Sequence, residues 1–137
     1  MPNYPIKIVL VDESPEFRDT LRLDLEKRRG LQVVAEAGDG ISAVQTVKQH
    51  HPDALVMALV MPGMDGVDAT RQVRTISPDT KVIILTKYAN RENYERAIQA
   101  GATILITKTC TTRQVYRSIL SCIYGGPATE CISGAPL

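Results

Sequence analysis

The chain has 137 residues, enough for one domain with a single hydrophobic core. Its 16 basic and 15 acidic residues leave a net charge of +1, which excludes a general electrostatic attraction to nucleic acid or to an anionic membrane. The longest apolar run, residues 54–61, is far shorter than the roughly 20 residues of a membrane helix. The first residues lead directly into a strand-like run, with Lys7 as their only basic residue, and so do not form a signal peptide. We therefore expect a cytoplasmic protein without a membrane partner.

Five short apolar runs rich in β-branched residues predict five strands, over residues 6–11, 31–37, 54–59, 81–86 and 103–107. Most of these runs are apolar without alternation, which is typical of strands that are buried on both faces of a parallel sheet.

Apolar residues at helical spacing predict a helix after each strand. The first helix covers residues 15–29, where Phe17, Leu21 and Leu25 share one face, and it ends at Gly30. The other four start near Ser42, at about Val67, after Asn90 and after Thr111 or Thr112, and they end at "KQHHP", "SPD", Gly101 and Gly125-Gly126.

Strand and helix thus alternate five times, which predicts an α/β fold with a parallel five-stranded sheet and right-handed crossovers. The expected arrangement is flavodoxin-like, with strand order 2-1-3-4-5 and helices on both faces. Residues 1–126 form the predicted domain. Residues 127–137 show no periodicity and are interpreted as a tail or a truncated linker.

The three cysteines lie in the last quarter of the chain and form no CxxC pair. This spacing favours reduced thiols over a disulfide framework. We interpret Cys110 as a small side chain in a loop, in preference to a redox-active thiol beside Lys108.

Polar side chains follow several of the predicted strands at their carboxyl ends. Asp12 and Glu13 follow the first strand, Thr86 ends the fourth and Lys108 follows the fifth. Because the carboxyl ends of parallel strands meet at one edge of a sheet, we expect these side chains to converge. Carboxylates suit Mg²⁺, and an ammonium group suits a phosphoryl oxygen. At the same edge the third strand delivers only Ala58, whose methyl group has no such chemistry.

Four segments of the chain resemble the receiver domains of two-component response regulators: "KIVLVDESPEFR" (7–18), "PDALVMALVMPGMDG" (52–66), "KVIILTKY" (81–88) and "GATILITKT" (101–109). The resemblance extends from residue 6 to about residue 126 and is strongest to the NarL/FixJ-type branch. Receivers of that branch usually precede a DNA-binding helix-turn-helix domain. The resemblance implies a CheY-like fold and a signalling module rather than an enzyme.

In that family, an aspartate at the end of the third strand accepts a phosphoryl group from a histidine kinase. The motif match implies a Mg²⁺ site formed by Asp12, Glu13 and the backbone carbonyl of Val60. It likewise implies that Thr86 is the switch hydroxyl and that Lys108 contacts the phosphoryl group. The phosphoacceptor position itself corresponds to Ala58.

A methyl group cannot form an acyl phosphate, so we predict that the chain is not phosphorylated at Ala58. Like charges about 4 Å apart repel by roughly 4 kcal/mol at an effective dielectric near 20, so two carboxylates in place of three should relieve strain in the metal-free site. The absence of the third carboxylate also leaves Lys108 free to pair with Asp12 or Glu13. We therefore expect weaker Mg²⁺ binding, and a more stable metal-free fold, than in an Ala58→Asp variant.

No other carboxylate replaces the missing one. Asp53 lies five residues before Ala58, roughly 16 Å away along the same strand, and Asp65 is expected to start the next helix. Two further positions depart from the family pattern. Leu105 stands where an aromatic residue is usual, and Thr109 stands where many relatives have Pro or Asp.

Two explanations of Ala58 stay open at this point. The chain is either a natural stand-alone pseudo-receiver, acting as a phosphorylation-independent interaction module, or a regulator of transcription with an engineered acceptor replacement, cut from a longer protein. The survival of the other site residues favours the second, as do the eleven residues after Gly126, too few for a helix-turn-helix domain. A nucleotide-binding enzyme is disfavoured because GxGxxG is absent.

The expected partner is a histidine kinase or another signalling protein. A homodimer through the first and fifth helices is also expected, and DNA would be bound only through a C-terminal domain outside this sequence. The candidate contact residues are Tyr88, Tyr94, Tyr116 and Arg117, because Tyr and Arg are enriched in interfaces.

Overall fold

Five parallel strands form the central sheet of the computed structural model, which describes residues 5–125. The strands are β1 (Ile6–Val11), β2 (Leu31–Ala37), β3 (Ala54–Met57), β4 (Lys81–Thr86) and β5 (Ile104–Thr107). Their order across the sheet is β2-β1-β3-β4-β5, and every neighbouring pair is parallel. The predicted fold class and strand order are confirmed. The predicted tail, residues 127–137, lies outside the described residues.

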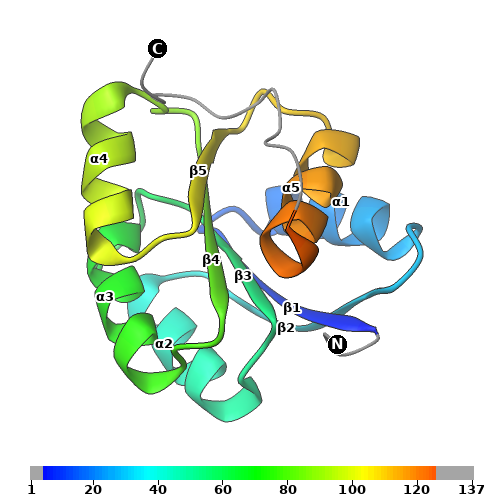
Figure 1. Ribbon diagram of the computed structural model, residues 1–137, viewed down its shortest axis with the longest axis horizontal. Coiled ribbons are helices and arrows are strands. Elements are labelled where there is room, and N and C mark those ends of the chain that lie inside the picture. Colours follow the sequence, from blue (N-terminus) through cyan, green and yellow to red (C-terminus); the bar gives the residue numbers. More distant parts are fainter. Residues whose placement is uncertain (1–4, 126–137) are drawn as a thin grey trace.

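Helices cover both faces of this sheet. They are α1 (Pro15–Glu26), α2 (Gly40–His50), α3 (Gly66–Ile76), α4 (Arg91–Ala100) and α5 (Thr112–Tyr124). Helices α1 and α5 lie on one face, and α2, α3 and α4 lie on the other (Figure 1).

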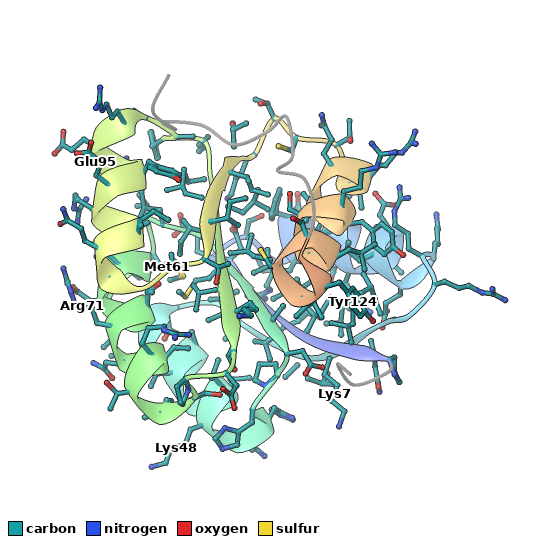
Figure 2. The ribbon with its side chains drawn as sticks, viewed as in Figure 1. Lys7, Lys48, Met61, Arg71, Glu95 and Tyr124 are labelled. Atoms are coloured by element: carbon teal, nitrogen blue, oxygen red, sulfur yellow. The ribbon has the colours of Figure 1, made fainter. Side chains whose placement is uncertain are left out.

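Successive residues of a strand point to opposite faces of the sheet, so each face has its own core. On β1, Ile8 and Leu10 pack with the residues of α1 and α5, whereas Val9 and Val11 pack with those of α2, α3 and α4. All four are at most 2% exposed. This burial on both faces explains why the strand sequences are apolar without alternation. Figure 2 shows the contrast with the outer surfaces of the helices, where Lys48, Arg71 and Glu95 lie at the periphery and Met61 lies inside.

Each helix begins at a side chain that accepts a hydrogen bond from a backbone N–H of the first turn, an arrangement that stabilises helix starts. The capping residues are Ser14, Asp39, Asp65, Asn90 and Thr111. The predicted caps Asn90 and Thr111 are therefore confirmed, as is the expected role of Asp65.

Two helix boundaries differ from the prediction. Helix α2 begins at Gly40, ahead of Ser42, because the Asp39 carboxylate accepts a hydrogen bond from the Ser42 backbone N–H at 2.7 Å. That bond also lowers the pKa of Asp39. Helix α1 ends at Glu26 instead of residue 29.

Strand β3 is shorter than predicted and ends at Met57, so that Ala58 lies in the first part of the β3–α3 loop. The loop closes on itself where the Gly66 N–H donates to the Leu59 carbonyl at 2.7 Å. The approach is tight: a Cβ atom on Gly66 would lie 2.4 Å from the Ala58 carbonyl oxygen. A residue with a side chain would therefore force the loop away from α3.

The expectation of reduced thiols is wrong for Cys110, which is disulfide-bonded. Cysteine spacing does not reveal such a bond, because disulfide formation depends on Cα separations in the folded chain. Cys122 is a free thiol whose burial raises its pKa to about 11. No helix within residues 5–125 is both long and apolar enough to span a membrane.

Candidate functional site

The residues that the sequence analysis singled out do meet at one edge of the sheet, where β1, β3, β4 and β5 end. Val11 pairs with Met57, the last residue of β3, so Asp12 and Ala58 leave adjacent strands at the same level. Thr86 pairs with Thr107, which places Lys108 directly beyond the end of β4. The Lys108 N–H donates to the Thr86 carbonyl at 2.9 Å. The predicted convergence is therefore present.

Asp12 is the buried acid of the site, with 3% of its surface exposed. Its Oδ2 accepts a hydrogen bond from Lys108 Nζ at 2.5 Å, and its Oδ1 accepts one from the Ser14 N–H at 2.9 Å. A buried carboxylate needs such partners, because an unpaired buried charge is costly. Glu13, by contrast, is exposed. The ion pair expected for Lys108 is thus formed with Asp12 and not with Glu13.

Lys108 is also held from the side of α1. Its Nζ lies 4.4 Å from the centroid of the Phe17 ring, within range for a cation–π interaction. With the ring on one side and the Asp12 carboxylate on another, the Lys108 side chain is 21% exposed. The lysine therefore has a defined position without any phosphoryl group.

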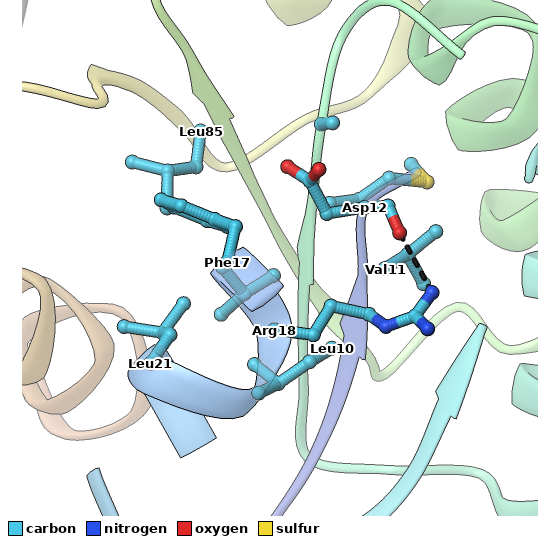
Figure 3. A pocket seen from close by; sticks show the side chains of 10 residues that line it. Leu10, Val11, Asp12, Phe17, Arg18, Leu21 and Leu85 are labelled. Atoms are coloured by element: carbon cyan, nitrogen blue, oxygen red, sulfur yellow. Dashed lines mark hydrogen bonds between the residues drawn. The ribbon is translucent and has the colours of Figure 1, made fainter. Parts of the chain in front are cut away.

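Ala58 is 4% exposed, and its N–H donates to the Val11 carbonyl at 2.9 Å. The residue lines a cavity of about 10 Å³, and Asp12, Phe17 and Arg18 also line it (Figure 3). A cavity of this size is at the lower limit for one water molecule. The position is therefore part of a small, largely apolar pocket beside the Lys108–Asp12 pair.

Neither carboxylate that was considered as a substitute reaches Ala58. Asp53 lies at the opposite edge of the sheet, where its Oδ2 accepts a hydrogen bond from the Lys7 N–H at 2.8 Å. Asp65 caps α3 and lies 3.7 Å from Arg96 on α4.

Thr86 is 2% exposed, and its Oγ1 accepts a hydrogen bond from the Tyr88 N–H at 3.0 Å. Leu105, at the position where the family usually has an aromatic residue, is completely buried in the core. Leu105 has no aromatic ring, which weakens the case for a paired threonine–aromatic switch in this chain.

The oxygen donors proposed for Mg²⁺ are of the right chemical kind. Mg²⁺ is bound through one or two carboxylates and keeps several waters, and Asp12, Glu13 and the Val60 carbonyl offer such a set. No group of three or more His, Cys, Asp or Glu side chains that could hold a metal occurs within the described part of the chain. Because the Asp12 carboxylate already binds Lys108, a cation there has to compete with an ammonium group.

Sequence reasoning missed one residue that contacts the site, Arg18 on α1. Its Nη1 donates hydrogen bonds to the Asp12 carbonyl at 2.7 Å and to the Ala37 carbonyl at 2.9 Å. Figure 3 shows the guanidinium group reaching the backbone at Asp12. The sequence carries no signal for this role, because Arg18 binds backbone carbonyls; its ion pair with Glu36, which Arg22 shares, is visible only in the fold.

Comparison with known proteins identifies this arrangement. A family model described as the response regulator receiver domain matches residues 8–120. The chain belongs to this receiver domain family. As a receiver domain it is a signalling module.

Individual relatives agree with this assignment. The receiver is 33% identical over 125 residues to the transcriptional regulatory protein LiaR of Bacillus subtilis, covering 91% of this chain and 59% of LiaR. The signal receiver domain of NarL from Mycobacterium tuberculosis superimposes with a TM-score of 0.86 and 29% identity, over 90% of this chain and 100% of that domain. A LuxR-family response regulator from Aurantimonas sp. SI85-9A1 gives a TM-score of 0.84 and 32% identity, over 90% of this chain and 88% of that one.

These relatives place the receiver in the NarL/LuxR type. The chain spans only about half the length of the curated relatives it matches. The activities and partners of those full-length proteins are therefore only proposals for this chain.

Proposed function

We propose that this receiver domain acts without aspartyl phosphorylation. The observation that carries the proposal is the place of Ala58, directly after β3 and level with Asp12, where the family has its phosphoacceptor. Thr86 and Lys108 lie at the neighbouring strand ends on the same edge of the sheet, but Ala58 offers no nucleophilic oxygen.

The Lys108–Asp12 ion pair supports this proposal. In a receiver with three carboxylates, the lysine is shared between the acids and a phosphoryl group. Here it bonds to one buried acid and lies against the Phe17 ring. The charge of Asp12 is therefore compensated within the protein, which supports a defined conformation of the site without a phosphoryl group.

We infer that the domain works through protein contacts, with a histidine kinase or another signalling protein as its partner. Its relatives include LiaR, a transcriptional regulatory protein, which supports an effect on transcription through a DNA-binding domain outside this sequence. Both explanations of Ala58, a natural pseudo-receiver or an engineered replacement in a conventional regulator, agree with this inference. The cytoplasmic location stays a prediction.

A homodimer through α1 and α5 is part of this proposal. Leu23 on α1 is 56% exposed, Tyr124 on α5 is 49% exposed, and Arg117 is exposed as well. Tyr116 contributes less to such a contact, because its hydroxyl donates to the Arg29 carbonyl at 3.1 Å within the same chain.

Phosphorylation chemistry tests the proposal directly. After incubation with acetyl phosphate and Mg²⁺, we expect the intact mass of the Ala58→Asp variant to increase by one phosphoryl group. We expect no change for the present chain, because a methyl group cannot attack phosphorus. Ala58→Asn is the matched control, since it has the shape of aspartate without a nucleophilic oxygen.

An adduct on the present chain would overturn the assignment of Ala58. An absence of adduct on Ala58→Asp would show that the rest of the site has lost competence, which favours the natural pseudo-receiver over the engineered regulator.

Magnesium affinity gives a second prediction. Isothermal titration calorimetry should show that the present chain binds Mg²⁺ at least about tenfold more weakly than Ala58→Asp, which corresponds to about 1.4 kcal/mol. The physical reason is the lost third carboxylate, together with the competition from Lys108. Thermal melts without metal should show the opposite order of stability, because the variant brings like charges together. Equal Mg²⁺ affinities would contradict the prediction.

A further inference from the structure

We propose that Arg18 is a positioning residue for the Mg²⁺ site: it fixes the backbone that carries Asp12 and Glu13. This inference rests on the proposed role of these two acids in binding the cation. It goes beyond that role by assigning a function to a side chain that contacts the backbone of Asp12 but neither carboxylate group.

The geometry is that of a clamp between two strand ends. A single nitrogen, Nη1 of Arg18, donates to the carbonyl of Asp12 at 2.7 Å and to the carbonyl of Ala37 at 2.9 Å. The Asp12 N–H itself donates to the same Ala37 carbonyl at 3.1 Å. Both backbone polar groups of Asp12 are thereby tied, directly or through Arg18, to the last residue of β2.

The guanidinium group is itself held in place. Its Nε lies 3.3 Å from Glu36 Oε1, and the side chain is 18% exposed. Gly38 provides the necessary space, because a Cβ atom there would approach Nη1 to 3.0 Å. The orientation of Arg18 therefore depends on the Glu36 carboxylate and on the lack of a side chain at Gly38.

This clamp matters most when a cation enters. Lys108 then has to leave Asp12 Oδ2, and the carboxylate loses one of its two hydrogen bonds. The carbonyl that Arg18 holds belongs to the peptide unit joining Asp12 to Glu13. Fixing that unit limits the movement of the backbone from which both side chains project, so less reordering is needed as the cation binds. Groups that orient metal ligands in this way typically contribute about 10- to 100-fold in metal affinity.

The test uses Ala58→Asp as the parent protein and Mg²⁺ itself as the probe, measured by calorimetry. Arg18→Ala in this parent is expected to weaken Mg²⁺ binding about tenfold, and Arg18→Lys should recover part of that loss because it keeps a donor. Arg22→Ala is the matched control. Arg22 lies on the same helix and pairs with Glu36 at 3.0 Å, but it donates no bond to Asp12. Its Mg²⁺ affinity should stay within about twofold of the parent.

Gly38→Ala is a second variant, whose Cβ atom would lie 3.0 Å from Nη1 and push the guanidinium group off its two carbonyl partners without removing it, and it should weaken Mg²⁺ binding less than Arg18→Ala does. It keeps the inference testable if Arg18→Ala does not fold. Unchanged Mg²⁺ affinity in the Arg18 or Gly38 variants, or an equal loss in Arg22→Ala, would overturn the role of Arg18. Failure of the parent itself to bind Mg²⁺ would instead overturn the proposed metal site, and the clamp with it.

Discussion

Replacing Lys108 by methionine is expected to lower the free energy of unfolding by about 2 kcal/mol. The change leaves the Asp12 carboxylate, whose side chain is 5% exposed, without its counter-charge. Breaking a fully buried ion pair costs about 3–5 kcal/mol, and the 21% exposure of Lys108 reduces that figure through solvent screening. Urea denaturation followed by circular dichroism measures the difference.

Two controls isolate the effect of the ion pair. Lys87→Met alters an exposed lysine on the loop after β4 and should change stability by less than about 0.5 kcal/mol. Adding Asp12→Asn to Lys108→Met removes the buried charge and should restore most of the lost stability. A Lys108→Met variant as stable as Lys87→Met would show that the pair contributes nothing to the fold.

For the replacement of Gly66 by alanine, helix propensity and tertiary packing predict changes of opposite sign in the free energy of unfolding. Gly66 is the first residue of α3, and helix propensity alone favours alanine over glycine by about 1 kcal/mol. The tertiary structure favours the opposite result, because the new Cβ atom would lie 2.4 Å from the Ala58 carbonyl oxygen and 3.0 Å from the Leu59 Cα. These are backbone atoms, so the loop itself has to move. We expect a net loss of about 2–3 kcal/mol in the free energy of unfolding.

Gly63 offers the comparison within the same loop. It has a φ of +72° and no atom within 4 Å of its ideal Cβ position, so Gly63→Asn meets no contact and adopts a tolerated conformation. Its cost should stay below about 1 kcal/mol. If Gly66→Ala stabilises the protein, the close approach of the loop to α3 has no energetic consequence.

Much of this fold could be predicted because local and tertiary signals agree. β1 is apolar at successive positions because Ile8 faces one core and Val9 the other. Asn90 and Gly101 bound α4 as predicted, since a capping side chain and a left-handed glycine act within one turn of the helix. The site followed from the same logic, because residues after parallel strands meet at one edge.

The features that were missed depend on contacts between segments far apart in the chain. The partner of Arg18, Ala37, lies 19 residues later and offers only a backbone carbonyl, which no side-chain pattern indicates. The disulfide at Cys110 was not visible in the cysteine spacing either. Strand β3 ends early because the loop after it bonds to Gly66, which no local pattern indicates.

The first turn of α1 holds two neighbouring side chains that reach different loops. Phe17 lies against Lys108 from the β5–α5 loop, and Arg18 binds Asp12 from the β1–α1 loop. One helix therefore contacts both members of the Lys108–Asp12 ion pair. A protein that binds to α1 would perturb the surroundings of the ammonium group and of the Asp12 backbone at the same time. Binding at α1 is therefore expected to affect this edge of the sheet without any covalent modification.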